Sequence, residues 1–293
     1  MSVRTRTLTR ATKGWIFVMM TIGTCVTFDS LPLAPKFKNL AELGLHHCQL
    51  MSWDQSQRTD ERVQEVLDAC KEYDVTITAL WCGWEGPVEW NFYGGQETLG
   101  LVPEAYRYAR VLNLKQGADF AKKIGVTDIV THMGYVPSNP YDSRYPGFVA
   151  AVTNIAAYLK QNDQYLLFET GQETPVTLLR LFEDVGLDNL GVNLDPANLI
   201  LYGMGNPVDA LDVFGKYVRG VHGKDGKYPT SGRALGEETA MGEGKVDFPK
   251  LIKGLYDLGY DGCITIEREI EGDQQVKDVI LARDMLQNII ANL

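Results

Sequence analysis

The amino-acid sequence predicts a single α/β domain that folds as a closed (β/α)8 barrel. Short apolar segments alternate with helical patterns along the chain, which is typical of a parallel sheet covered by helices on both faces. Eight such segments are present, and eight strand–helix units fit a closed barrel better than an open sheet. The 293 residues, of which 45% are hydrophobic, can form one large core. We expect an N-terminal tail at residues 1–14 and the barrel domain at residues 15–293.

The eight predicted strands are short segments, five to eight residues long, in which apolar side chains predominate. Runs of this length with little polar alternation indicate strands that are buried on both faces. They lie at residues 16–23, 45–51, 75–82, 128–133, 165–169, 190–195, 218–222 and 262–267.

Helical patterns fill intervals between the predicted strands. Residues 58–73 place apolar side chains with a period near 3.6. Residues 174–186 begin with a Thr–Pro pair that suits a helix N-terminus and end at a glycine, and residues 248–262 also reach a glycine near their end. The segment 83–104 is too long for a plain connection. Because it follows the third strand, we expect it to lie over the mouth of the barrel, the end where the strands finish.

The N-terminal segment has two interpretations. Four basic residues precede an apolar run at residues 15–23, an order that resembles the charged and apolar regions of a signal peptide. The run is too short for a transmembrane helix, and no Ala-x-Ala cleavage pattern follows it. We favour a polar tail followed by the first barrel strand.

Charge and cysteine content restrict the partners and the compartment. The net charge is −10, and no dense basic block follows the N-terminus, so a nucleic acid is a poor partner. The five cysteines are scattered without a CxxC motif, which favours reduced thiols in a cytoplasmic protein. We expect neither nucleic-acid nor membrane binding.

Four successive predicted strands end on a side chain that can bind a metal ion. YLLFE ends at Glu169, LGVNLD at Asp195, VRGVH at His222 and GCITIE at Glu267. The C-terminal ends of barrel strands meet at one face, where active sites lie. Three carboxylates and one imidazole suit Mn²⁺ or Mg²⁺ and would accept Co²⁺. The sequence therefore predicts one divalent cation at the mouth, which would explain why buried strands end on charges.

The motifs FETG, NLDPAN, VHGKD and ITIERE, at these strand ends, resemble those of the xylose-isomerase-like barrel superfamily. The resemblance covers roughly residues 120–293. Within this superfamily, the motifs resemble those of the sugar phosphate isomerase/epimerase group, which includes ketose 3-epimerases and AP endonucleases. It implies that Glu169, Asp195, His222 and Glu267 bind one divalent metal ion. It also implies that the two glutamates carry protons on opposite faces of a sugar substrate.

Two positions depart from the ketose 3-epimerase pattern. Asn198 stands where those enzymes carry a histidine, three residues after the metal-site aspartate, and Tyr228 stands where they carry an arginine. Asn198 is therefore a candidate substrate ligand, and Arg233 in the following segment is a candidate replacement for that arginine. An AP endonuclease would need a basic DNA-binding face and more histidines than the four in this chain.

Further candidates lie near the predicted mouth. His132 ends the fourth strand and is a candidate general base or substrate ligand, the alternative being a hydrogen-bonded structural residue. His46 and His47 lie in the second strand, where alternation places one of them inside the barrel, so His47 is included as a substrate ligand. Lys224 follows the metal-site histidine and is a candidate ligand of a substrate oxygen, the alternative being a solvated loop charge.

Aromatic residues gather after the second and third strands. Aromatic faces stack well on sugar C–H surfaces, so Trp81 and Trp84 are candidate substrate contacts. The alternatives are loop packing and a subunit contact. The set comprises Trp53, Trp81, Trp84, Trp90, Phe92 and Tyr93.

Three functions fit these features. The first is a metal-dependent isomerase or epimerase of a ketose or oxo-sugar. There the metal stabilises an enediolate formed when Glu169 or Glu267 removes a proton, and the other glutamate returns it. The second is a lyase that cleaves 3-oxo-glycosides, C- or O-linked, at the same metal site with His132 as base. The third is a non-catalytic barrel for binding or assembly. We expect a homo-oligomer, and a glycoside-cleaving lyase would also admit a hetero-oligomer.

Overall fold

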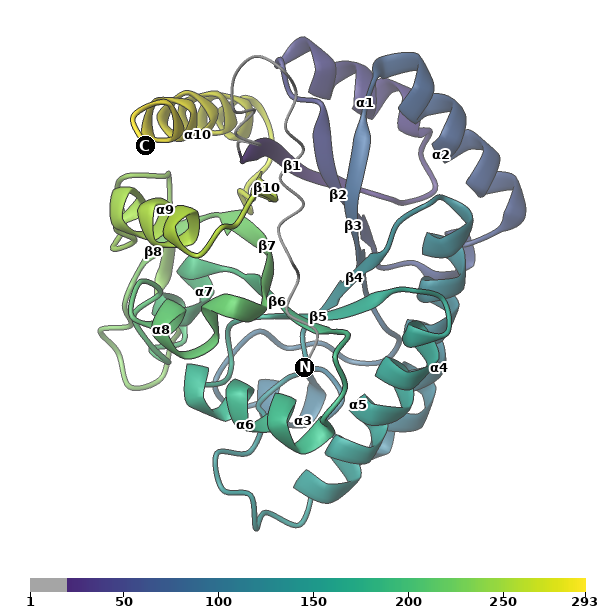
Figure 1. Cartoon of the computed structure of the whole chain (residues 1–293), viewed down its shortest axis with the longest axis vertical. Coiled ribbons are helices and arrows are strands. Elements are labelled where there is room, and N and C mark those ends of the chain that lie inside the picture. The colour runs from purple at the N-terminus through teal and green to yellow at the C-terminus, as the bar shows by residue number, and fades with distance from the viewer. Residues whose placement is uncertain (1–19) are drawn as a thin grey trace, which may run out of the picture.

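The computed structural model describes residues 20–293 and confirms the closed (β/α)8 barrel. Eight parallel strands surround the axis in the order β1-β10-β7-β6-β5-β4-β3-β2 (Figure 1). Strands β8 and β9 form a separate antiparallel pair. The bounds are β1 Thr21–Thr27, β2 His47–Ser52, β3 Thr76–Cys82, β4 Asp128–Thr131, β5 Tyr165–Glu169, β6 Leu190–Leu194, β7 Val218–Gly223, β8 Asp225–Lys227, β9 Glu237–Thr239 and β10 Cys263–Ile266. Seven barrel strands match predicted strands to within two residues at each end.

Helices cover the outside of the barrel (Figure 1). Helix α6 begins as predicted, because the hydroxyl of Thr174 accepts a hydrogen bond from the backbone N–H of Thr177, and Pro175 is its first residue. No helix described in residues 20–293 combines the length and the apolar composition needed to cross a membrane. The helices are α1 Leu33–Glu42, α2 Asp60–Tyr73, α3 Gly95–Thr98, α4 Glu104–Lys123, α5 Tyr145–Lys160, α6 Pro175–Val185, α7 Pro196–Leu201, α8 Ala210–Phe214, α9 Phe248–Asp257 and α10 Asp273–Ala291, with 3₁₀ turns at Gln55–Gln57 and Gly215–Tyr217.

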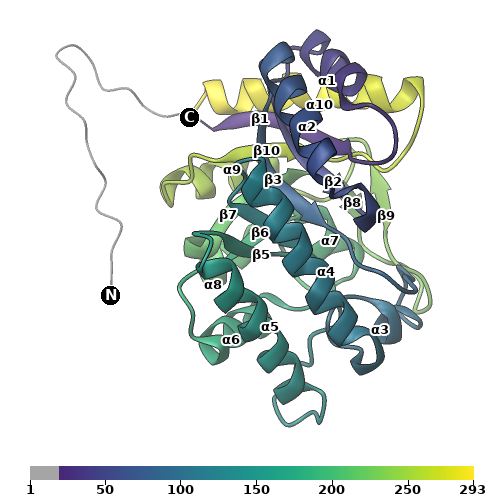
Figure 2. The ribbon, with the colours of Figure 1, turned by 90° about the vertical axis from the view of Figure 1, so that its right-hand side faces the viewer.

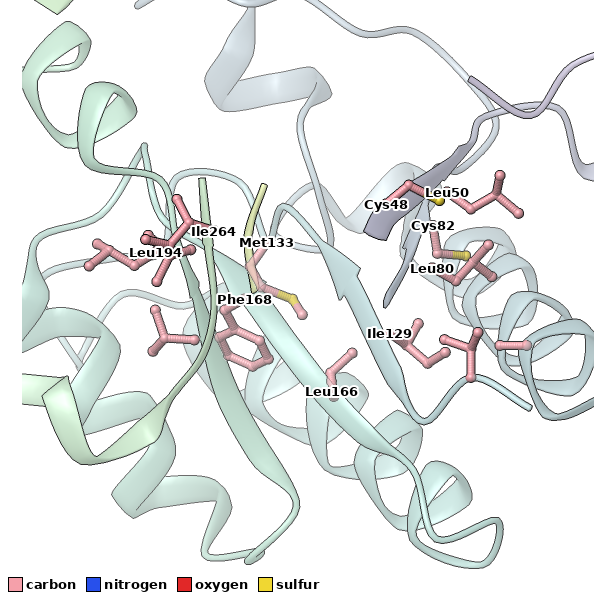
Figure 3. Close-up of a cluster of buried hydrophobic side chains, with 14 of the residues drawn as sticks. Cys48, Leu50, Leu80, Cys82, Ile129, Met133, Leu166, Phe168, Leu194 and Ile264 are labelled. Atoms are coloured by element: carbon pink, nitrogen blue, oxygen red, sulfur yellow. The ribbon is translucent and has the colours of Figure 1, made fainter. Parts of the chain in front are cut away.

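The strands present two layers of side chains. Leu166 and Phe168 of β5 belong to the main hydrophobic core, between the strands and the helices (Figure 3). Leu167, between them, points inward and packs in a smaller cluster with Trp81. Full burial of a large apolar side chain stabilises a fold by about 1.5–3 kcal/mol. The two layers therefore fix β5 firmly, and with it the inward-facing Glu169 at its end.

The first strand is displaced from its predicted position. It is Thr21–Thr27, whereas the apolar run predicted it at residues 16–23, of which residues 16–19 lie outside the described part of the chain. Threonine and valine favour strands without forming an apolar run, so the hydrophobic pattern did not mark TIGTCVT. Gly23 suits this position, because a Cβ there would lie 2.3 Å from the carbonyl oxygen of His47 on β2.

A buried arginine anchors the segment at residues 83–104. This segment lies at the mouth, as predicted, with the Trp90 ring 5.0 Å from the ring of His132. Figure 2 shows its helix α3 at the same end of the barrel as α7 and the β8–β9 pair. Neither α7 nor the β8–β9 pair was predicted, because these elements are only three to six residues long. The guanidinium of Arg110 on α4 holds the segment by donating to the backbone carbonyls of Glu85, Pro87, Thr98 and Gly100.

Candidate functional site

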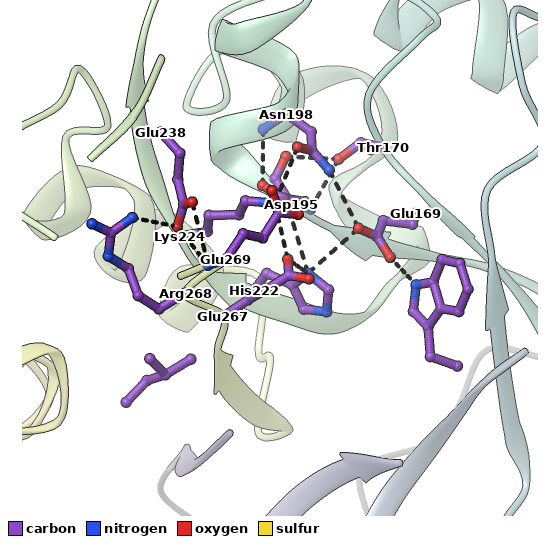
Figure 4. A network of polar contacts seen from close by, with 12 residues as sticks. Glu169, Thr170, Asp195, Asn198, His222, Lys224, Glu238, Glu267, Arg268 and Glu269 are labelled. Carbon is purple, nitrogen blue, oxygen red and sulfur yellow. Dashed lines mark hydrogen bonds and ion pairs between the residues drawn. The ribbon is translucent and has the colours of Figure 1, made fainter. Parts of the chain in front are cut away.

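The four predicted strand-end residues come together at the mouth of the barrel (Figure 4). Glu169, Asp195, His222 and Glu267 each offer one ligand atom, and these atoms lie within 4.8 Å of one another. Nδ1 of His222 is 3.0 Å from Oε2 of Glu267 and 3.5 Å from Oδ2 of Asp195. Oε1 of Glu169 is 3.6 Å from the same nitrogen. Three of the side chains are buried, and that of Glu267 is 13% exposed.

The two carboxylate oxygens of Asp195 face different groups. Asp195 is the N-cap of α7, where Oδ1 accepts a hydrogen bond of 2.9 Å from the backbone N–H of Asn198. Oδ2 faces the cluster instead. The hydroxyl of Thr170 holds the backbone here, because it donates to the carbonyl of Asp195 at 2.8 Å and accepts from its N–H at 2.9 Å. The helix cap therefore sets the direction of the second oxygen.

The donor atoms of the cluster fit a hard divalent cation. Oδ2 of Asp195 and Nδ1 of His222 are buried and make no hydrogen bond within residues 20–293. Burial would raise the pKa of Glu267, but Lys224 and His222 hold that pKa well below its usual range. Charged carboxylates in a buried cluster need a cation, and three carboxylates with one imidazole suit Mn²⁺ or Mg²⁺. The cluster is thus suited to hold one divalent ion.

Lys224 supplies a positive charge beside the cluster. Its Nζ is 2.7 Å from Oε1 of Glu269 and 3.2 Å from Oε2 of Glu267, and it is 3.5 Å from Oδ2 of Asp195. It also lies 3.4 Å from the amide oxygen of Asn198, to which it donates. Burial would lower the pKa of Lys224, but the surrounding carboxylates raise it, so the group is an ammonium ion. Because the side chain is only 2% exposed, Lys224 is not a solvated loop charge.

Three sequence-predicted candidates meet at Glu169. Nε2 of His132 lies 3.2 Å from Oε1 of this carboxylate, and the amide of Asn198 donates to the same oxygen at 3.3 Å. The indole N–H of Trp81 donates to the other oxygen, Oε2. Burial would raise the pKa of Glu169, but His132 and His222 lower it. Burial would likewise lower the pKa of His132, but Glu169 raises it.

Four tryptophans form a wall beside His132. The ring centroid of Trp53 lies 4.8 Å from that of Trp81, 5.5 Å from that of Trp84 and 6.4 Å from that of Trp90. Trp81 and Trp90 in turn lie 5.9 Å and 5.0 Å from the ring of His132. The indole N–H of Trp84 is buried and unpaired within the described residues. An aromatic surface next to a few convergent polar groups is the usual composition of a small-molecule pocket.

Two predicted substrate ligands are not brought into the cluster. His47 is the first residue of β2, so it lies at the opposite end of the barrel, where it borders a cavity with Leu45 and Gln287. Strand alternation distinguishes inside from outside, but the position along the strand decides which end a side chain reaches. Arg233 is exposed on the loop between β8 and β9. The position of His47 does not suit a ligand of a substrate at the mouth, whereas the assignment of Arg233 stays a prediction.

Two polar residues beneath the cluster were missed from the sequence. Gln49 of β2 and Asn193 of β6 are buried, and both contact His222. A signal was present, because in CQLM and LGVNL one polar residue interrupts an otherwise apolar stretch. The strand-end criterion does not detect them, since neither residue ends its strand.

Glu173 is a buried carboxyl group in the loop after β5. The loop passes close to His132, because a Cβ added at Gly171, two residues before Glu173, would lie 3.5 Å from Cε1 of that histidine. Oε2 of Glu173 makes no hydrogen bond within residues 20–293. Burial raises the pKa of Glu173 to about 8, although His132 opposes the shift. The group is therefore mostly neutral near neutral pH.

We expect Glu173→Gln to stabilise the protein, and to do so more at pH 8 than at pH 5. The unfolded chain ionises this carboxyl near its ordinary pKa of 4.5, whereas the folded protein ionises it only near pH 8. The stability that the neutral carboxyl group contributes is fully present below the pKa of the unfolded chain. It is lost as the pH rises through the pKa of the folded protein. Glutamine avoids this loss, which is on the order of a few kcal/mol. Urea unfolding of both proteins at the two pH values tests this, and a pH-independent difference would contradict it.

The fold and the cluster define a (β/α)8 barrel protein with a buried ligand set for a divalent metal. Residues 37–289 match the family described as xylose isomerase-like TIM barrel. The chain belongs to this family, as the strand-end motifs predicted.

One similar protein supports this membership, and further structures share the fold. A xylose isomerase domain protein from Planctomyces limnophilus is 33% identical, with a TM-score of 0.87 over 94% of this chain and 100% of that one. A D-tagatose 3-epimerase-like protein shares the fold at 20% identity, with a TM-score of 0.71 over 93% and 97%. A barrel protein from Mycobacterium smegmatis, in complex with magnesium, does so at 17% identity, with a TM-score of 0.67 over 88% of each chain. Protein MJ1311 of Methanocaldococcus jannaschii is 28% identical over 120 residues, which span 40% of this chain and 37% of that protein.

Proposed function

We propose that the protein is a divalent-metal-dependent isomerase or epimerase that acts on a ketose or oxo-sugar. The observation that carries the proposal is the buried cluster of Glu169, Asp195, His222 and Glu267 beside the tryptophan wall. One barrel of the same fold bears the name D-tagatose 3-epimerase-like, and another was solved with magnesium, which supports this reading. The four residues would hold a Mn²⁺ or Mg²⁺ ion, or alternatively a Co²⁺ ion. The bound ion would supply Lewis acidity toward the sugar oxygens.

The two glutamates are the proposed proton carriers. A carboxylate can take a proton from carbon only if one of its oxygens is free to face the substrate. Glu267 directs Oε2 toward His222 and Lys224, and no hydrogen bond to its Oε1 is present within residues 20–293. Both oxygens of Glu169 accept hydrogen bonds, from Trp81 and from an amide. We therefore assign proton abstraction to Glu267 and proton return to Glu169. The imidazolium of His132, whose Nε2 lies 3.2 Å from Oε1 of Glu169 and whose pKa is raised by that carboxylate, would supply the returned proton.

Lys224, Asn198 and the tryptophan wall are the proposed substrate contacts. The ammonium of Lys224 would stabilise the negative oxygen of an enediolate, because it is buried and charged where the effective dielectric is low. Asn198 offers an amide between Lys224 and Glu169, and it would orient a neighbouring hydroxyl. The tryptophan rings would cover the apolar face of the sugar and exclude water.

A second candidate function is cleavage of a 3-oxo-glycoside at the same site. The placement of His132 favours this alternative, because its ring lies against Trp81 and Trp90, where an aromatic aglycone would stack. Its Nδ1 is buried and makes no hydrogen bond within the described residues, so it is available to take a proton. The four intact ligand residues argue against a non-catalytic barrel.

NMR in D₂O with Mg²⁺ and a panel of ketoses and 3-oxo-glycosides separates these functions. For the epimerase we expect deuterium to enter at one carbon of a ketose without release of any fragment, because proton abstraction exchanges with solvent. Release of an aglycone that is abolished by His132→Ala would establish the lyase instead. Retention of the metal with no exchange on any substrate in the panel would contradict both.

A further inference from the structure

Three polar side chains, those of Gln49, Asn193 and His222, contact one another inside the barrel beneath the cluster. Nε2 of His222 lies 2.9 Å from Oε1 of Gln49 on β2 and 3.0 Å from Nδ2 of Asn193 on β6. Gln49 in turn donates from Nε2 to Oδ1 of Asn193 at 2.8 Å. All three side chains are buried, with 2% exposure or less. Branched apolar side chains dominate the interiors of such barrels, so a polar group here calls for a specific role.

The sheet is irregular at both amide residues. The pairing of β2 with β3 shifts register between Cys48 and Gln49, and the pairing of β6 with β7 shifts between Val192 and Asn193. Such irregularities re-aim side chains and are frequent beside active sites. Gly220 of β7 leaves room for the pair, because a Cβ there would lie 2.3 Å from Oδ1 of Asn193. The backbone therefore accommodates the two amides at three separate positions.

The chemistry of the imidazole explains why the amides are there. Nδ1 of His222 faces the three carboxylates of the cluster, so a neutral ring that offers Nδ1 to a cation must carry its proton on Nε2. Oε1 of Gln49 is the acceptor for that proton. Asn193 cannot donate to a protonated Nε2, and instead it orients Gln49 by accepting from its amide. Histidine ligands of metals are commonly oriented through the second ring nitrogen.

We propose that Gln49 and Asn193 are positioning residues that hold His222 in the tautomer with a free Nδ1 and thereby set the affinity of the cluster for a divalent cation. The inference rests on the proposed metal site. It adds a contribution from β2, a strand that supplies none of the four ligand residues. Gln49 would act through His222, which its side chain contacts together with Asn193 inside the barrel.

Titration with Mn²⁺, followed by EPR, measures the effect on affinity. The variants are Gln49→Leu, which removes the acceptor, and Gln49→Glu, which keeps one. Gln164→Leu is the control, since Gln164 is another buried glutamine, and its amide donates to the carbonyls of Ala118 and Val126. We expect Gln49→Leu to weaken Mn²⁺ binding by about 10- to 100-fold, and the other two to remain within about threefold of wild type.

¹⁵N NMR of the Mg²⁺-loaded protein reports the tautomer directly. The chain has four histidines, so the signal of His222 can be assigned by replacing the other three. We expect the proton on Nε2 in the wild type. A proton on Nδ1, or Mn²⁺ affinity of Gln49→Leu within about threefold of wild type, would overturn the inference. If Gln49→Leu does not fold, the wild-type spectrum and the Mn²⁺ titration of Gln49→Glu still test the inference. A loss of Mn²⁺ affinity of tenfold or more in Gln49→Glu would also overturn the inference. A wild-type protein that binds no Mn²⁺ contradicts the metal site itself instead.

Discussion

Glu267→Gln is expected to keep the fold and to lose activity by at least about 10²–10⁴-fold. The change is nearly isosteric, so the packing at the end of β10 should survive. It removes the proposed proton acceptor, and it also removes a negative charge 3.0 Å from Nδ1 of His222 and 3.2 Å from Nζ of Lys224. The loss therefore combines acid–base chemistry with weaker metal binding.

The two causes can be separated by measuring bound metal and turnover together at saturating Mn²⁺. Glu271→Gln is the matched control, because Glu271 follows the same strand but is exposed to solvent. If Glu267→Gln holds the metal and turns over within about tenfold of wild type, the relay between the two glutamates is wrong. Glu267 would then be at most a metal ligand, and His132 would be the next candidate for the base.

Asp195→Asn is expected to lower the affinity for Mn²⁺ by more than about 10²-fold while leaving the fold intact. Changes to residues that only orient a metal ligand already cost about 10- to 100-fold, and Asp195 is a proposed ligand itself. Asparagine is as good an N-cap as aspartate, so the hydrogen bond that Oδ1 accepts from the backbone N–H of Asn198 should persist. The charge on Oδ2, which faces His222, is lost. The substitution thus removes the negative charge that faces the cluster and keeps the helix cap.

Mn²⁺ titration and thermal unfolding of Asp195→Asn, alongside Asp195→Ala, check this expectation. Alanine should weaken binding as well, and it should also destabilise the fold by about 1 kcal/mol because α7 loses its cap. An Asn variant that binds Mn²⁺ within about tenfold of wild type would show that Asp195 acts only as a helix cap.

The fold was predictable wherever burial on both faces made a strand continuously apolar. YLLFE coincides with β5 residue for residue, because its outward and inward side chains are both buried. TIGTCVT of β1 escaped the same criterion, because threonine and glycine break the apolar run while favouring or permitting the strand. The β8–β9 pair escaped it because three-residue strands carry too few side chains to form a pattern.

The candidate site was predictable to the extent that strand ends determine it. Glu169, Asp195, His222 and Glu267 meet because parallel strands of a barrel deliver their last residues to one face. The polar residue Gln49 within β2 was visible in the sequence, but its contact with His222 was not. That contact joins two residues 173 positions apart and depends on a register shift that no local pattern encodes.

Anomalous diffraction from crystals of the protein soaked in Mn²⁺ tests the metal site directly. We expect one strong manganese peak per chain at the mouth of the barrel. Glu169, Asp195, His222 and Glu267 should each place one atom at about 2.0–2.4 Å from it. A peak elsewhere, no peak at all, or a peak that leaves two of these four side chains outside the coordination sphere would contradict the proposed metal site.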